Sequence, residues 1–134
     1  MPSFTFKRTE RLKSRKTIQK LFSNGNSYAV YPLRLVWIPV EKVEGTSIQF
    51  ALSVAKKRVP KAAHRNILRR RIRESWRLHK HLLYQQLEGQ EQCFAFMVLF
   101  TGNKELPYET IEESMKTIIQ RFPKKMRANQ KANR

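Results

Sequence analysis

The segment from Lys56 to Lys80 carries the side chains with the most specific chemistry in the chain. Eleven of its twenty-five residues are Lys or Arg, and Glu74 is its only acid. Arginine dominates, and a guanidinium group can bind two phosphate oxygens at once. Packing so much like charge into one segment costs self-repulsion that folding alone does not offset. The segment therefore predicts a surface that binds a polyanion through its phosphates.

The charge of the whole chain supports the same prediction. The 134 residues carry a net charge of +18. Of the 28 basic residues, 24 fall in three blocks, residues 1–22, 56–80 and 121–134, and most acids lie between the blocks. A surface that serves only solubility intersperses the two signs, whereas separated blocks attract polyanions. Nucleic acid is the favoured partner, with an anionic membrane surface as the weaker alternative.

The chain offers little for catalysis of its own. It contains no Asp, and two-metal nucleases need clustered carboxylates. Metal-free cleavage needs two imidazoles at one phosphate, but His79 and His81 lie about 200° apart around a helix. Cys93 is the single cysteine, which excludes an intramolecular disulfide and suits a reducing cytosol. We expect no catalytic and no metal-binding residue, and a soluble cytoplasmic protein that does not enter a membrane, because no apolar run reaches 18 residues.

The spacing of apolar residues predicts one α+β domain in which helices back a small sheet. The expected elements are a short helix from the N-cap Ser14 to a stop at Asn24–Gly25, a small extra strand at 28–30, strands at 33–38 and 48–55, a helix at 62–87, a strand at 93–100 and a helix at 106–122. The sheet would have about four strands, counting the extra strand. Along the chain, the elements follow one another in the order α-β-β-(β)-α-β-α.

Two expectations concern how these elements are arranged. The strands at 33–38 and 48–55 should pair as a hairpin through a turn at Glu44–Thr46. The strand at 93–100 is apolar on both faces, which is typical of a strand at the sheet centre. The expected domain limits are a basic N-terminal extension at 1–10, a single RNA-binding domain at 11–122 and a mobile basic tail at 123–134.

Helical geometry directs the charges of the 62–87 helix. At roughly 100° per residue, Leu68, Ile72 and Trp76 share a stripe that must face the sheet. The predicted phosphate-binding residues lie beside that stripe or in the approach to the helix: Lys56, Lys57, Arg58, Lys61, Arg65, Asn66, Arg69, Arg70, Arg73, Arg77 and Lys80. A merely solvated face is the alternative, but like charges three and four residues apart destabilise a helix. A helix that reads DNA bases usually carries more Asn, Gln, Ser or Thr, so RNA is favoured over DNA.

The stretch RVPKAAHRNILRRRIRE closely resembles the signature of the bacterial ribonuclease P protein subunit. The positions that match its Arg-Asn-Arg-x-Lys/Arg-Arg-x-x-Arg-Glu pattern are Arg65, Asn66, Arg69, Arg70, Arg73 and Glu74, and those that match its N-terminal pattern are Arg11, Leu12, Leu21, Phe22 and Gly25. The resemblance covers about residues 11–122. Ile67, Pro60 and Ile18 depart from the pattern, and Ile67 removes the third residue of Arg-Asn-Arg.

The resemblance implies a fold and a function. The fold would be ribosomal-protein-S5-domain-2-like, with a left-handed crossover that runs against the general preference. The protein would be the non-catalytic subunit of a ribonucleoprotein that removes the 5′ leader from precursor tRNA, leaving a 5′-phosphate. A catalytic RNA with Mg²⁺ would hydrolyse the bond, and the protein would bind that RNA as a monomer.

The resemblance also implies a cleft for the single-stranded leader. We expect its lining to include Ile18, Phe22, Arg34 and Val36, and the opposite strand face, with Leu33, Leu35 and Trp37, is the alternative. The rival function is that of a ribosomal or other structural RNA-binding protein with no role in processing. A DNA-binding protein and a self-sufficient ribonuclease are more distant alternatives.

Overall fold

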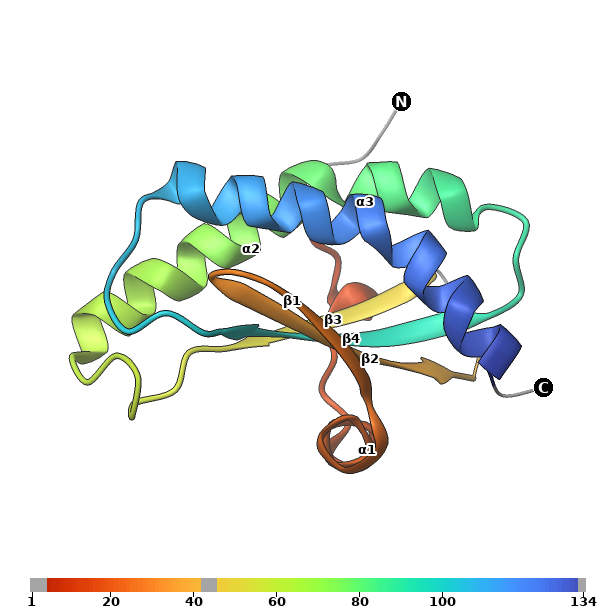
Figure 1. Ribbon diagram of the computed structural model, residues 1–134, viewed down its shortest axis with the longest axis horizontal. Coiled ribbons are helices and arrows are strands. Elements are labelled where there is room, and N and C mark those ends of the chain that lie inside the picture. Colours follow the sequence, from red (N-terminus) through yellow and green to blue (C-terminus); the bar gives the residue numbers. More distant parts are fainter. Residues whose placement is uncertain (1–4, 42–45, 133–134) are drawn as a thin grey trace.

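A mixed four-stranded sheet separates one helix from two others (Figure 1). The computed structural model describes residues 5–41 and 46–132. Its elements are a short 3-10 helix η1 (Arg8–Glu10), α1 (Arg15–Asn24), β1 (Asn26–Val30), β2 (Leu33–Val40), β3 (Ile48–Ser53), α2 (Ala62–Leu87), β4 (Cys93–Phe100) and α3 (Tyr108–Ala132). The predicted α+β class and element order, including the extra strand, are confirmed. Within the described ranges, no helix is both long and apolar enough to cross a membrane.

The strand order in the sheet is β1-β2-β4-β3. β4 lies between β2, with which it is antiparallel, and β3, with which it is parallel. Seven of its eight residues are buried, which confirms the predicted central strand. The crossover from β3 to the parallel β4 is α2, so the long basic helix is fixed at both ends to neighbouring strands.

The predicted hairpin between the strands at 33–38 and 48–55, which are β2 and β3, is wrong. β2 pairs with β1 from Asn26–Trp37 to Val30–Leu33, and β3 pairs with β4 instead. Alternation of apolar residues shows which side of a strand is buried but does not identify its neighbour, and β1 is too short to give a strong signal. The predicted turn at Glu44–Thr46 falls mostly outside the described residues.

β2 also runs through Pro39 to Val40 rather than stopping before the proline. The pairing with β1 ends at Trp37, so beyond that residue no strand of the described residues borders this side of β2. A proline, which has no N–H to donate, is tolerated at such an open edge.

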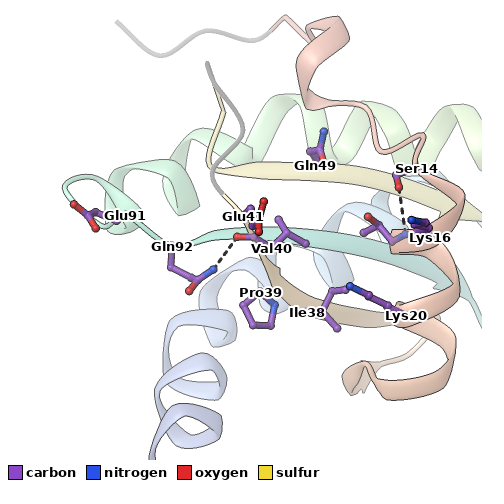
Figure 2. Close-up of a pocket in the computed structure, with 11 residues that line it drawn as sticks. Ser14, Lys16, Lys20, Ile38, Pro39, Val40, Glu41, Gln49, Glu91 and Gln92 are labelled. Carbon is purple, nitrogen blue, oxygen red and sulfur yellow. Dashed lines mark hydrogen bonds between the residues drawn. The ribbon is translucent and has the colours of Figure 1, made fainter.

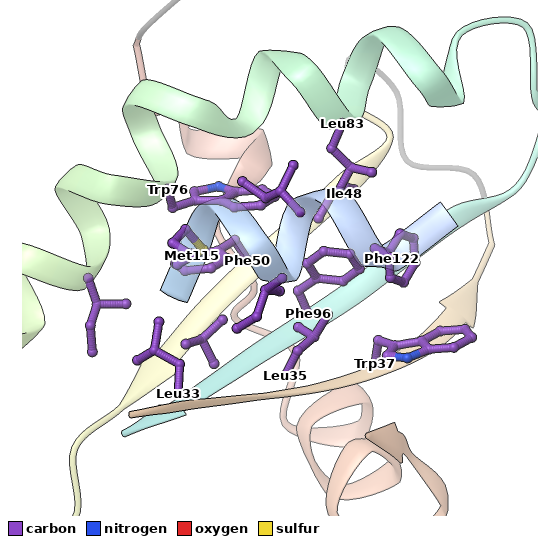
Figure 3. Close-up of a cluster of buried hydrophobic side chains, with 14 of the residues drawn as sticks. Leu33, Leu35, Trp37, Ile48, Phe50, Trp76, Leu83, Phe96, Met115 and Phe122 are labelled. Carbon is purple, nitrogen blue, oxygen red and sulfur yellow. The ribbon is translucent and has the colours of Figure 1, made fainter. Parts of the chain in front are cut away.

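The larger of two cores lies between the sheet and the helices α2 and α3 (Figure 3). Trp76 of α2 stacks on Phe50 of β3 with ring centroids 4.7 Å apart. Phe122 of α3 packs edge-on against Trp37, Phe94 and Phe96 at 4.7–5.2 Å. Aromatic pairs in these geometries add about 0.5–1.5 kcal/mol each beyond the burial of their area. The packing turns the apolar stripe of α2 onto the sheet and its opposite side to solvent.

This core decides between the two strand faces considered for a leader cleft. Leu33, Leu35 and Trp37 are at most 2% exposed and lie beneath the helices. The alternative cleft face is therefore wrong, because no RNA can reach those side chains in the folded protein. The opposite face of β2, with Arg34 and Val36, lies on the side of α1 and the smaller core.

The predicted tail from residue 123 is helical as far as Ala132, so the prediction that α3 ends at Phe122 is wrong. Pro123 lies inside the helix, where it removes one backbone hydrogen bond. Three residues later Met126 is 2% exposed and belongs to the larger core. Burial of a methionine side chain contributes about 1.5–3 kcal/mol, which offsets much of the cost of the proline.

A buried ion pair fastens the N-terminal segment to α2. Lys80 Nζ lies 2.5 Å from Glu10 Oε2, and it also donates to the carbonyl oxygen of Thr5. The Tyr84 hydroxyl donates to the same carboxylate oxygen at 2.6 Å, and the backbone N–H of Lys7 donates to its other oxygen at 3.0 Å. Burial raises the pKa of Glu10, but these hydrogen bonds outweigh it and hold the pKa below its ordinary value.

Lys80 was predicted to contact RNA, and the structure contradicts this. Its side chain is 2% exposed because the segment around Glu10 covers this flank of α2. Helical periodicity places a residue around the axis but does not show which other segment packs against it. The available signal was Glu10 itself, the only acid in the N-terminal basic block.

Substituting Glu10 by Ala should lower the free energy of unfolding by about 3–5 kcal/mol, because it leaves the Lys80 ammonium buried without a counter-charge. The double variant Glu10→Leu with Lys80→Met removes both charges and should recover most of that loss. Urea unfolding followed by circular dichroism measures both. Glu113→Ala is the matched control, since this carboxylate is exposed and forms no ion pair with any described residue. A loss below 1 kcal/mol for Glu10→Ala would show that the pair does not fasten the segment.

Candidate nucleic-acid interface

The loop before α2 is braced by two of the predicted arginines. Arg65 donates from Nη1 to the carbonyl oxygens of Val59 at 3.1 Å and Pro60 at 2.7 Å. Arg58 donates from Nη1 to the carbonyl oxygen of Thr101 at 2.9 Å, which ties the loop to the end of β4. Carbonyl oxygens orient these guanidiniums without neutralising them. Both residues therefore keep a full positive charge at the start of α2.

The exposed cations of α2 and its approach form the strongest candidate surface. Arg70 and Arg73 are exposed and have no hydrogen-bond or ion-pair partner among the described residues. Arg69 donates to the side-chain oxygen of Asn66 at 2.9 Å, a contact that orients it without removing its charge. We name as the α2 basic face Lys56, Lys57, Arg58, Lys61, Arg65, Asn66, Arg69, Arg70 and Arg73. Because no carboxylate of the described residues pairs with its members, the face is available to phosphates.

The row of unneutralised cations on α2 is shorter than predicted, because carboxylates neutralise its C-terminal members Arg77 and Lys80. Arg77 donates from Nε to Glu74 Oε2 at 3.1 Å, and hydrogen bonding to Arg77 lowers the pKa of Glu74. This i,i+3 pair is readable in the sequence, so Arg77 is a weaker candidate than Arg70 or Arg73. Together with the burial of Lys80, it confines the unneutralised charges to the first three turns of α2.

Contacts on the other flank of α2 fix it against α3 and against the loop that precedes α3. Arg71 Nη1 lies 3.0 Å from Glu105 Oε1, and His79 Nε2 lies 3.0 Å from Glu112 Oε2. The hydrogen bond with His79 lowers the pKa of Glu112. His79 thereby joins the two helices. Over the described part of the chain, no group of three or more His, Cys, Asp and Glu side chains is placed to hold a metal ion.

The N-terminal segment adds cations beside the α2 basic face. A hollow of about 490 Å³ lies between this segment, β3 and α2, and it is lined by Phe6, Arg11, Leu12, Lys13, Phe50, Ala51, Leu52, Arg69 and Arg73. The Arg11 guanidinium lies 5.5 Å from the centroid of the Phe6 ring. The sequence places Arg11 and Lys13 more than fifty residues from Arg73, so their proximity follows only from the fold.

A second and larger hollow of about 810 Å³ lies between α1 and the sheet (Figure 2). It is lined by Ser14, Lys16, Thr17, Lys20, Ile38, Pro39, Val40, Glu41, Gln49, Glu91 and Gln92. Two lysines of α1 face two glutamates across it, so the hollow as a whole is not cationic. The i,i+4 spacing of Lys16 and Lys20 was the only sequence signal for this site, and our predictions missed it.

The four residues predicted for the leader cleft do not line that hollow. On α1, Phe22 is about 200° from Lys20, so it lies on the opposite flank of the helix. On β2, Arg34 precedes Ile38 by four residues, or about 13 Å along the strand. Arg34 donates from Nη1 to the Ser27 hydroxyl at 3.0 Å.

The exposure of these four side chains differs greatly. Phe22 is 61% exposed, Ile18 and Arg34 are half-buried, and Val36 is buried. Val36 supports the helix: a Cβ added to Gly25 would come 2.5 Å from Val36 Cγ1, so the glycine lets α1 end close to the sheet. Phe22 and Arg34 thus remain accessible on the side of α1 away from the large hollow, while Val36 is a packing residue.

These features define a class of protein: a small α+β domain with a directed arginine surface, as in RNA-binding proteins. The sequence matches the Ribonuclease P family model over residues 6–123. A ribonuclease P protein component from Porphyromonas gingivalis strain W83 is 36% identical over 122 residues, which cover 90% of this chain and 88% of the relative. One from Chlorobaculum tepidum is 32% identical over 83 residues, 60% of this chain and 54% of the relative.

Solved structures share the fold. The RNase P protein from Thermotoga maritima superimposes with a TM-score of 0.64 at 21% identity, covering 84% of this chain and 97% of that one. The Staphylococcus aureus RNase P protein gives 0.62 at 21% identity, covering 83% and 93%. This chain belongs to the ribonuclease P protein family, the protein component of an endoribonuclease that also contains an RNA subunit. The predicted resemblance is confirmed.

Replacing Arg70 and Arg73 by Gln should weaken binding to the RNA subunit and flatten its dependence on salt. If each arginine contacts one phosphate, the slope of log affinity against log salt falls by about 1.4–1.8. Arg71→Gln is the matched control, since this arginine is held by Glu105 and the carbonyl of Leu106. The control should lower the unfolding temperature and leave the slope unchanged. Equal slopes for the double variant and the wild type would remove these arginines from the interface.

Proposed function

We propose that the chain is the accessory subunit of ribonuclease P that binds both the catalytic RNA and the 5′ leader of precursor tRNA. The α2 basic face supports this most directly, because Arg70 and Arg73 project from a packed helix and no carboxylate of the described residues neutralises them. The arginine positions that match the family signature are the ones on that face. Phosphates of a structured RNA supply the missing counter-charges.

The leader, in this proposal, crosses the sheet on the Phe22 side of α1. An exposed aromatic ring can stack on an unpaired base, and base stacking of this kind contributes about 1–3 kcal/mol per base. Arg34 lies on the same sheet face and can contact the backbone of the strand. The large hollow on the other flank is less suited, because Glu41 and Glu91 line it.

Phosphodiester hydrolysis in the proposed holoenzyme belongs to the RNA subunit with Mg²⁺, and yields tRNA with a 5′-phosphate. The protein contributes no catalytic residue and acts by position: it neutralises phosphates of two RNAs near the scissile bond. One copy per holoenzyme and a cytoplasmic location complete the proposal. The absence of Asp from the sequence supports the assignment of metal chemistry to the RNA.

Cleavage of precursor tRNA at low Mg²⁺ by protein alone, RNA alone and both together tests this assignment. We expect cleavage to accelerate only when the two are combined. Cleavage by the protein alone would contradict a non-catalytic role. No gain on combining them would instead favour a structural RNA-binding protein without a processing role, which family membership makes the weaker candidate.

Phe22→Ala should weaken the binding of precursor tRNA by the holoenzyme about 5- to 150-fold, as expected for the loss of one stacked base. Binding of mature tRNA, which has no leader, should not change. Stability should change by no more than about 0.5 kcal/mol, because the ring is exposed. Leu21→Ala is the contrast, since this buried neighbour should cost about 2–5 kcal/mol of stability. Equal losses for the two tRNAs would exclude Phe22 from the leader site.

A further inference from the structure

The C-terminal half of α3 carries a second group of directed cations. Arg121, Lys124 and Lys125 are exposed and lie within an arc of about 100° on this helix. We name these three residues the α3 ridge. None of them forms an ion pair with a carboxylate in the described part of the chain. Arg127 is also exposed and lies about 60° further around the axis.

Two ordinary explanations for basic residues in a helix do not account for the ridge. Cations stabilise a helix C-terminus through the macrodipole, but this effect falls off within the last turn. Lys125 is seven residues before the end of α3 at Ala132, and Arg121 is eleven. Side-chain pairing does not explain it either, because the neighbours of Arg121 at i+3 and i+4 are Lys124 and Lys125 themselves. Like charges at these spacings destabilise a helix.

The ridge is held rigidly at the β1 edge of the sheet. The Tyr28 hydroxyl of β1 donates to the carbonyl oxygen of Ile118 at 2.6 Å, which fixes α3 against this edge strand. The Lys125 ammonium lies 5.5 Å from the centroid of the Tyr28 ring. Burial of Met126 one residue later keeps the helix in this direction beyond Pro123. The three cations are therefore presented by a packed helix and not by a loose tail.

The ridge and the α2 basic face lie at opposite ends of the molecule. The first turns of α2 lie at one end of the long axis, and the C-terminal half of α3 runs toward the other (Figure 1). The flank of α3 that packs on α2 carries Glu112, which binds His79, whereas Arg121 and Lys125 lie on the flank toward β1. An RNA segment that occupies one surface leaves the other accessible.

We propose that the α3 ridge is a second RNA-binding surface, which contacts backbone phosphates of the RNA subunit separately from the α2 basic face. The inference rests on the proposed function, because it needs the RNA subunit as partner. Among the described residues, the exposed aromatic rings are Phe22 and Tyr31, which belong to α1 and the turn after β1, so the ridge itself presents cations without an exposed ring for stacking on unpaired bases. A surface that has cations alone suits the phosphate backbone of a folded RNA rather than the single-stranded leader.

The test is the salt dependence of affinity for the RNA subunit, measured with the triple variant Arg121→Gln, Lys124→Gln and Lys125→Gln. We expect the slope of log affinity against log salt to fall by about 2–3, because up to three phosphates lose their partners. Lys116→Gln is the control on the same helix. At saturating protein, the preference of the holoenzyme for precursor over mature tRNA should stay as in the wild type. The unfolding temperature should stay equal or rise, because repulsion within the helix is relieved.

The outcomes separate this inference from the proposed function. An unchanged slope for the triple variant, alongside a reduced one for Arg70→Gln with Arg73→Gln, would overturn the ridge and leave the function intact. If Lys116→Gln lowers the slope by as much per charge removed as the triple variant does, the effect comes from net charge. That result would also contradict the α3 ridge as an RNA-binding surface. Losses from the α2 and α3 variants that add when combined support two separate surfaces. A wild-type protein that does not bind the RNA subunit would contradict the proposed function itself.

Discussion

The burial of one side of α2 is the constraint on which the rest of the structure depends. Trp76 stacks on Phe50, and Leu68 and Ile72 are fully buried beneath the same helix, so the orientation of α2 about its own axis is fixed. Everything the helix presents to solvent follows from that orientation. The buried apolar stripe alone fixes which side of the helix its charged side chains occupy, so they need no hydrogen-bond or ion-pair partner to hold that direction.

Carboxylates within the chain neutralise only part of that charge. Glu10 pairs with Lys80, Glu74 with Arg77, and Glu105 with Arg71. The pairs of Lys80 and Arg71 also fasten α2 to another segment, whereas the pair of Arg77 lies within α2. The α2 basic face and the α3 ridge have no such carboxylate partners in the described part of the chain. The protein therefore keeps like charges close together at two places, at a cost in helix stability that, in our proposal, binding to an RNA backbone offsets.

Much of this could be predicted from the sequence, and the exceptions share one cause. The N-cap Ser14, the central strand β4 and the apolar stripe of α2 follow from local spacing, and the structure confirms them. The pairing of β3 with β4, the burial of Lys80 and the helical path beyond Pro123 depend on contacts between distant segments. Periodicity reports the exposure of a face but not which segment covers it. Lys80 shows this best, since its place on the helix was predicted well and its surroundings were not.

The proposed function requires the α2 basic face, with the lysines that precede the helix, to lie against the RNA subunit. Acetylation of lysines by a water-soluble reagent, read by mass spectrometry with and without the RNA subunit, tests it most directly. Lys56, Lys57 and Lys61 are exposed in the free protein and should become several-fold less reactive in the complex, while Lys116 keeps its reactivity. Unchanged reactivity of the three lysines in a complex shown to be fully formed would contradict the account.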